Sequence, residues 1–151
     1  MPQSLSRVLL HITFSTKNRE PLIVDSVKER LFDYLGGVCR ECECQPIQIG
    51  GYNDHVHVLC ALSRKMAIMT LVEHLKRSSS KWIKEIAPKE CGQFYWQEGY
   101  GVFSVSPKQA NLVVEYIQKQ ETHHATHSLR EEYIQFLKQY NMDYDERYLW
   151  D

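Results

Sequence analysis

The chain has 151 residues, of which 43% are hydrophobic and 25% are charged, a composition typical of one globular domain and not of a disordered or fibrous protein. Its apolar runs are too short to cross a bilayer and no secretory signal is visible, so we expect a cytoplasmic protein. The five cysteines are an odd number, which argues against a disulfide framework.

Charge is distributed unevenly along the chain. The formal net charge is -1, yet residues 64–89 carry a local charge of +5 and residues 121–151 a local charge of -4. A phosphate backbone responds to local charge, because salt screens interactions beyond about 8–10 Å. The overall charge is therefore a poor guide to whether the protein binds nucleic acid.

The first half of the chain predicts a strand, a helix and a β-hairpin. Residues 8–14 are β-branched and apolar, as in a buried strand. Apolar residues at helical spacing predict a helix over about 24–42. Strands over 46–51 and 55–62 flank the turn-rich residues 52–54, which is typical of a hairpin.

The second half predicts two helices with a strand between them, followed by a last helix. A helix over about 67–86 ends at a proline, and the aromatic residues 93–105 suggest a strand entered through a turn. Ser106-Pro107-Lys108-Gln109 reads as a capping box that starts a third helix, running to about Gln120. A further helix over about 129–140 precedes an acidic tail.

This order predicts an α+β fold, with a ferredoxin-like β-α-β-β-α-β antiparallel sheet and an added C-terminal helix. The strand that begins at His55 is expected to be central in that sheet. We expect residues 1–128 to form one domain, with residues 129–151 as a C-terminal helix and acidic tail of the same domain.

His55 and His57 form the first candidate site. Alternate residues of a strand project from the same face, so both imidazoles point one way and Val56 points the other. Two imidazoles on one face are a pair of metal ligands, although two histidines on a half-exposed strand also occur as plain surface residues. The H-x-H pattern by itself leaves both interpretations open.

Tyr116 and Gln120 form the second candidate site. Four positions apart on the third predicted helix, they share one face of it. A tyrosine at the edge of a buried stripe also fits a boundary residue that packs its ring and hydrates its hydroxyl. The pair gains meaning only in combination with the two histidines.

Together these elements resemble a known family. Asp54 followed by His55-Val56-His57 resembles the HUH motif of nucleic-acid-nicking enzymes. The run 96–106, followed by residues 116–120, is similar to the single-tyrosine transposases of small bacterial insertion sequences, including relatives associated with repetitive extragenic palindromes. Many members have Met-Pro where this chain has Tyr52-Asn53, which leaves the histidines intact. The resemblance spans about residues 8–124.

The resemblance implies a DNA transposase that cuts and rejoins single-stranded DNA through a 5′-phosphotyrosine on Tyr116, which makes the third helix the catalytic one. It implies a divalent cation held by His55, His57 and the side-chain carbonyl of Gln120, and such mixed nitrogen and oxygen donors suit Mg²⁺ or Mn²⁺. It also implies binding of hairpin DNA ends and a homodimer. No nucleotide cofactor is expected, in agreement with the lack of a phosphate-binding loop motif.

Six basic residues are candidates for DNA contacts, with a solvated surface as the plain alternative: Lys17 and Arg19 after the first strand, and Lys76, Arg77, Lys81 and Lys84 on the second helix. Aromatic residues could stack on bases, but core packing is the simpler interpretation for them: Phe94, Tyr95, Trp96, Tyr100 and Phe103.

Two further groups of metal-ligand residues have ordinary interpretations. Cys39, Cys42 and Cys44 lack a matching downstream pair at zinc-finger spacing, and we expect thiols that bind no metal. The histidines 123, 124 and 127 are expected at the surface, although His124 lies one turn beyond Gln120. His11 is expected to be a core or boundary residue.

Two other functions remain open at this stage. An HUH enzyme with another purpose, such as a plasmid nickase or a domesticated nuclease, would use the same residues. A non-catalytic ferredoxin-like module that binds nucleic acid would carry the histidine pair and Tyr116 only incidentally.

Overall fold

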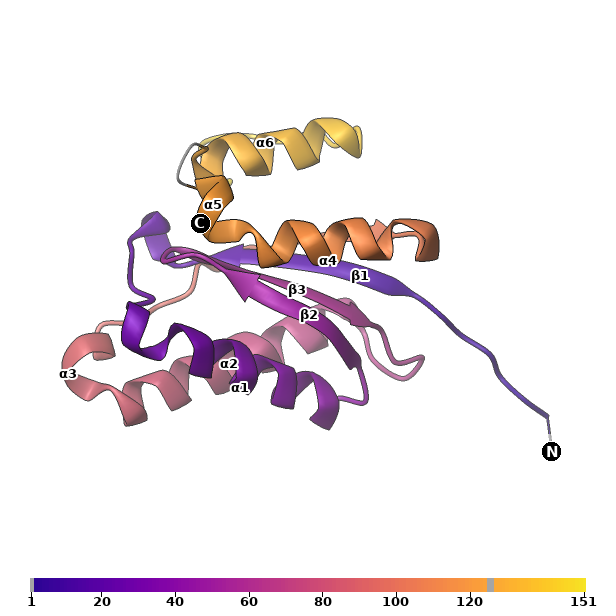
Figure 1. The fold of residues 1–151 in the computed structure, drawn as a ribbon, viewed down its shortest axis with the longest axis horizontal. Helices are drawn as coiled ribbons and strands as arrows, with labels where there is room; N and C mark the ends of the chain where they lie inside the picture. Colours follow the sequence, from indigo (N-terminus) through magenta and orange to yellow (C-terminus); the bar gives the residue numbers. More distant parts are fainter. Residues whose placement is uncertain (1, 125–126) are drawn as a thin grey trace.

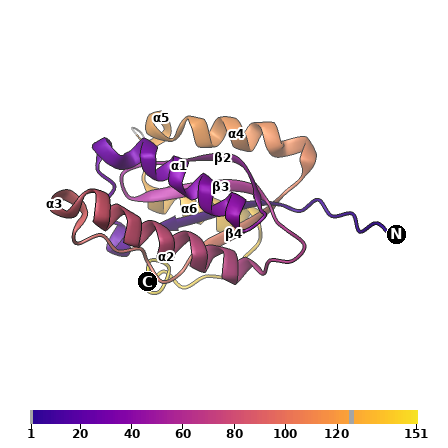
Figure 2. The ribbon, with the colours of Figure 1, turned by 90° about the horizontal axis from the view of Figure 1, so that it is seen from below.

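A four-stranded antiparallel sheet forms the centre of the molecule. The computed structural model describes residues 2–124 and 127–151. The strands are β1 (Leu9–Ser15), β2 (Gln45–Gly51), β3 (His55–Ala61) and β4 (Gly101–Val105). Their order is β2-β3-β1-β4, so the strand that begins at His55 is central, as predicted. Figure 1 labels β1, β2 and β3, and Figure 2 labels β4.

Helices cover both faces of this sheet. One face carries α1 (Asp25–Glu41) and α2 (Ile68–Ile86), and the other carries α4 (Ala110–Gln118) and α6 (Leu129–Gln139) (Figure 1 and Figure 2). The short elements are η1 (Lys17–Arg19), α3 (Pro88–Cys91), η2 (Pro107–Gln109) and α5 (Gln120–His124). The order of the elements and the antiparallel sheet confirm the predicted ferredoxin-like α+β class. None of the described helices has the length and apolar character that spanning a membrane requires.

Alternation along β3 decides which side chains face which layer. Val56 is fully buried in the main core, which lies between the sheet and the pair α1 and α2. Leu59 has the opposite orientation and packs against Ile117 of α4. Because alternate residues share a face, His55 and His57 lie on the side covered by α4 and α6.

Close backbone packing fixes α4 on the sheet. A Cβ atom at Gly50 of β2 would lie 2.8 Å from Cγ2 and 2.9 Å from the carbonyl oxygen of Ile117. Only a glycine admits so close an approach, so the contact sets the height of α4 above β2. Tyr116 is the neighbour of Ile117, and its position depends on that contact.

The C-terminal segment packs onto the same unit. Tyr133 and Leu137 of α6 form a small buried cluster with Phe103 of β4. Beyond α6, the ring of Trp150 lies under the guanidinium of Arg19, and the carbonyl oxygen of Asp151 accepts a hydrogen bond from the Gly99 amide.

The strand predicted within residues 93–105 is β4, which follows an irregular segment in which Trp96 buries its ring, donates its indole N–H to Ser79 and forms an isolated bridge with Thr16. The capping box predicted at residues 106–109 was wrong. Ser106 makes no side-chain cap; its carbonyl accepts from the Gln109 amide in the tight turn η2, and α4 begins only afterwards.

The third predicted helix is also interrupted before its expected end. Lys119 leaves the helical region, with φ of -98° and ψ of 19°, so α4 ends at Gln118 and Gln120 begins α5. Tyr116 and Gln120 therefore belong to two consecutive helices. They remain in contact, since the Gln120 side-chain amide donates to the Tyr116 carbonyl at 3.3 Å.

Candidate active site

His55 and its hydrogen bonds define one side of the site. The side chain is fully buried, and its Nδ1 lies 2.7 Å from Oδ1 of Asp54. An ionised carboxylate only accepts, so Nδ1 carries the proton and Nε2 points into the site. Burial disfavours the imidazolium, but Asp54 and the charge of Glu132 outweigh it and raise the pKa of His55. The surroundings of His55 therefore favour a positive charge at this imidazole.

Gln120 faces His55 from α5. Its Oε1 lies 2.9 Å from His55 Nε2, while its amide nitrogen donates to a backbone carbonyl. Because the amide donor is engaged elsewhere, the oxygen is the atom presented to the imidazole. A lone pair on nitrogen and an amide oxygen at this distance require a proton or a metal cation between them.

His57 receives support from a residue that the sequence did not assign to the site. His11 of β1 is buried, and its Nε2 lies 2.7 Å from Nδ1 of His57. Burial, with a contribution from His57, lowers the pKa of His11 to about 3, and burial also lowers the pKa of His57. His11 orients the His57 ring and leaves Nε2 of His57 to point into the site.

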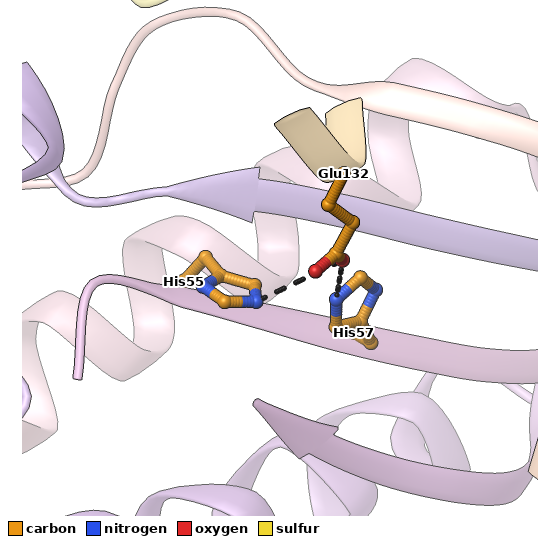
Figure 3. A group of neighbouring side chains, drawn as sticks. All are labelled: His55, His57 and Glu132. Carbon is orange, nitrogen blue, oxygen red and sulfur yellow. Dashed lines mark ion pairs between the residues drawn. The ribbon is translucent and has the colours of Figure 1, made fainter. Parts of the chain in front are cut away.

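Glu132 of α6 is the principal residue that sequence reasoning missed. Its Oε1 lies 2.6 Å from Nε2 of His57 and 3.9 Å from Nε2 of His55 (Figure 3), and its other oxygen contacts His124 Nε2. Burial would raise the pKa of this carboxyl, but the imidazoles of His57, His124 and His55 hold it well below its usual range. Helical spacing places Glu132 on the same face of α6 as Leu129 and Phe136, away from its exposed neighbour Glu131, but this spacing does not indicate which side chains that face meets.

Tyr116 lies beside the histidines within the same chain. Its ring centroid is 5.7 Å from that of His57 and 6.3 Å from that of His11. The side chain is half-buried, and burial together with the charge of Glu132 raises the pKa of the phenol, whereas the hydrogen bond with Gln120 lowers it. The structure thus brings Tyr116, His55, His57 and Gln120 together without a second chain.

The donor set fits a divalent cation. The ligand atoms of His55, His57 and Glu132 all lie within 4.8 Å of one another. His57 Nε2 and both oxygens of Glu132 are buried but make no well-directed hydrogen bond within residues 2–124 and 127–151. Polar atoms that converge in this way are satisfied by a cation placed between them. His55, His57 and the Gln120 carbonyl are in position to hold it, with Glu132 within reach.

Comparison with known proteins agrees with this geometry. The profile of the family described as "Transposase IS200 like" matches residues 4–120, which is most of the chain. This chain belongs to the IS200-like transposase family. The match ends at Gln120, so the shared region includes both histidines, Tyr116 and the amide.

Individual relatives of this transposase were found in sequence and in structure. It is 25% identical over 114 residues to the ISDra2 transposase TnpA of Deinococcus radiodurans, which covers 73% of this chain and 81% of that protein. A crystal structure of a candidate transposase from Deinococcus radiodurans R1 aligns with a TM-score of 0.64 at 23% identity, over 80% of this chain and 95% of the other. The structure of a REP-associated tyrosine transposase bound to a REP hairpin aligns with a TM-score of 0.59 at 13% identity, over 82% of this chain and 72% of the other. These two structures share the fold.

An open groove lies on the other helical face of the transposase. Its volume is about 900 Å³, and it runs between α2 and the connection that precedes β4. The four α2 residues considered for DNA contacts all line it: Lys76, Arg77, Lys81 and Lys84. Tyr95 and Tyr100, both exposed, are on its opposite wall, whereas the rings of Phe94, Trp96 and Phe103 are buried in hydrophobic clusters.

The basic residues of the groove differ in what they contact. Lys76 Nζ donates to the carbonyls of Gln97, Glu98 and Gly99 at 2.6–2.9 Å, which occupies all three of its protons. Lys17 of η1 and Lys84 of α2 lie over the ring of Tyr95, at 5.2 Å and 5.8 Å from its centroid. Lys17 therefore extends the basic surface from the groove toward the end of β1.

The cysteine group is separate from the site. All five cysteines carry thiols without a disulfide, and Cys39 and Cys44 are buried in the main core. In the part of the chain that the structure describes, no cysteine belongs to a cluster of metal-ligand residues. Core packing accounts for their placement.

Proposed function

We propose that this transposase cuts and rejoins single-stranded DNA through a covalent 5′-phosphotyrosine on Tyr116, with Mg²⁺ or Mn²⁺ held by His55, His57 and Gln120. One observation carries the proposal: the phenol, the two imidazoles and the amide oxygen converge in one chain, from β3, α4 and α5. Family membership supplies the substrate class, because transposases of this family act on DNA.

The residues have separate roles in this reaction. The Tyr116 oxygen attacks the scissile phosphorus, forms a phosphotyrosine bond and releases a DNA 3′-hydroxyl. A metal ion at the site would polarise that phosphate. His55, His57 and Gln120 would hold that ion beside Tyr116, so that a phosphate bound there lies next to the phenol. The energy of the phosphodiester bond is retained in the protein–DNA linkage, so a 3′-hydroxyl reverses the attack and no nucleotide cofactor is required.

The groove is our candidate for the path of the DNA strand. Arg77, Lys81 and Lys84 offer charges to phosphates, and Tyr95 offers an exposed ring on which a base stacks. Lys17 and Arg19 continue this surface. Lys76 stays among the candidates because it lines the groove, but its protons already bind carbonyls.

The substrate is proposed to carry hairpins. A structural relative was solved bound to a REP hairpin, and hairpins at the ends of a mobile element would mark the strand to be cut. One tyrosine cuts one strand, so the two ends of an element need two active sites, and we propose that a homodimer supplies them in the cytoplasm.

The test uses the full chain with Mn²⁺ and single-stranded DNA that contains hairpins from around its own gene. We expect a denaturant-resistant protein–DNA adduct that maps to the Tyr116 peptide. The variant Tyr116→Phe should lose cleavage and adduct while it keeps its DNA affinity, and Tyr144→Phe, at an exposed tyrosine of the C-terminal segment, should behave as the wild type. An adduct that persists in Tyr116→Phe would show that another residue is the nucleophile. DNA binding without any adduct would favour a non-catalytic module.

A further inference from the structure

We propose that Glu132 is a fourth protein ligand of the metal, so that the C-terminal helix α6 forms part of the active centre. This inference rests on the proposed function, since it concerns the same cation. The ligand set then becomes His55, His57, Gln120 and Glu132, contributed by β3, α5 and α6.

Interatomic distances support this ligand set. Ligands about 2.1 Å from an octahedral cation lie about 3 Å apart when adjacent and about 4.2 Å apart when opposite. His55 Nε2 and Gln120 Oε1, at 2.9 Å, have the spacing of adjacent ligands. Glu132 Oε1 lies 3.9 Å from His55 Nε2, near the spacing of opposite ligands. It lies 2.6 Å from His57 Nε2, and this distance needs to increase by only a few tenths of an ångström to reach the spacing of adjacent ligands.

Burial gives a second, independent argument. The Glu132 side chain is 2% exposed, and neither of its oxygens makes a well-directed hydrogen bond among the described residues. Burying a carboxylate costs several kcal/mol unless charge or hydrogen bonds compensate it. Apart from His124, the nearest groups are the Nε2 atoms of His57 and His55. As metal ligands these nitrogens carry lone pairs, and a cation between them and Oε1 satisfies both partners.

The second oxygen of Glu132 is oriented by His124. His124 Nε2 contacts that oxygen, and His124 Nδ1 lies 2.8 Å from the carbonyl oxygen of His127, which holds the ring in place. With one oxygen held from α5, the other is directed at His55 and His57. Such outer contacts to a ligating carboxylate are common in metal sites.

A carboxylate ligand changes what the metal does to the protein. It adds a hard anionic oxygen to three neutral donors, which strengthens the binding of Mn²⁺ or Mg²⁺. It also ties the docking of α6 to the occupancy of the site, because a ligand stabilises the conformation that binds it. Metal binding is therefore expected to protect the amides of α6 from hydrogen exchange.

The experiment measures Mn²⁺ affinity of the full chain by titration calorimetry, without DNA. Glu132→Gln keeps the shape of the side chain and removes its charge, and Glu131→Gln makes the same change at the exposed neighbour on the same helix. We expect Mn²⁺ binding to weaken at least about 10-fold in Glu132→Gln and to stay unchanged in Glu131→Gln. Hydrogen exchange should show Mn²⁺-dependent protection of residues 129–139 in the wild type and in Glu131→Gln, but not in Glu132→Gln.

The outcomes separate this inference from the proposed function. If Glu132→Gln binds Mn²⁺ as tightly as the wild type while His57→Ala binds none, the metal site stands and the role of Glu132 is refuted. If the wild type binds no Mn²⁺, or His57→Ala binds it as tightly as the wild type, both the metal site and this inference fail. Thermal unfolding of each variant without metal confirms that it is folded.

Discussion

The substitution Gly50→Ala tests whether the contact between β2 and α4 positions the nucleophile. The new Cβ would lie 2.8 Å from Cγ2 and 2.9 Å from the carbonyl oxygen of Ile117, whereas ordinary contacts begin at 3.4 Å. Relief of the clash requires a shift of about 0.6 Å, and because one of the atoms is backbone, α4 itself must move. Overpacking of this kind costs about 1–3 kcal/mol of stability.

The same shift should affect the chemistry of Tyr116 more than it affects DNA binding. Misplacement of a reacting group by about 1 Å costs about 100-fold in rate, so a shift of about 0.6 Å predicts a loss of about 10-fold or more. The assay is the single-turnover rate of adduct formation with saturating DNA, measured beside the free energy of unfolding in urea.

Gly37→Ala is the matched control for this substitution. A Cβ at Gly37 meets no atom within 4 Å, and the residue lies inside α1. Alanine there should stabilise the protein by about 0.5–1 kcal/mol and leave the cleavage rate unchanged. Wild-type stability and wild-type cleavage in Gly50→Ala would refute the argument that this contact sets the position of Tyr116.

Three further predictions concern DNA binding, pH and the C-terminal helix. Lys81→Ala should weaken the binding of single-stranded DNA similarly for all sequences. It should also make the slope of log K against log salt concentration shallower by about 0.7, as measured by fluorescence anisotropy at several salt concentrations. An unchanged slope would show that Lys81 does not contact the DNA. Burial lowers the pKa of His11 to about 3 in the native state, whereas its pKa in the unfolded chain is near 6.5. The unfolded chain therefore takes up a proton first, and the free energy of unfolding falls as the pH drops below 6.5. At pH 5 the loss due to His11 is about 2 kcal/mol. Urea unfolding at pH 7 and pH 5 should show that the free energy of unfolding falls by about 2 kcal/mol less in His11→Gln than in the wild type. Equal losses in the two proteins would contradict a lowered pKa of His11 in the native state. Ser128 caps α6, because its side chain accepts a hydrogen bond from the Glu131 amide. Ser128→Ala should lower the free energy of unfolding by about 1 kcal/mol and increase hydrogen exchange in residues 129–139. Unchanged exchange would mean that other contacts alone hold α6.

Much of the fold could be predicted because its signals are local. Apolar spacing located α1 and α2 to within a residue or two, and the turn between the two strands of the hairpin located β2 and β3. Prediction failed at both ends of α4. Ser106 makes no side-chain cap, and the break at Lys119 has no clear local signal.

The candidate site could likewise be predicted from the sequence only in part. The sequence by itself determined that His55 and His57 share a face, since alternation in a strand needs no knowledge of the rest of the chain. Through its resemblance to a family, it also predicted Tyr116 and Gln120 as residues of the site. Only the tertiary structure placed Gln120 against His55, 65 residues away, and His11 behind His57, 46 residues away. Glu132 enters the site for the same reason: side chains from separate elements meet where helices pack on a sheet, and no periodicity within a single element records which of them will meet.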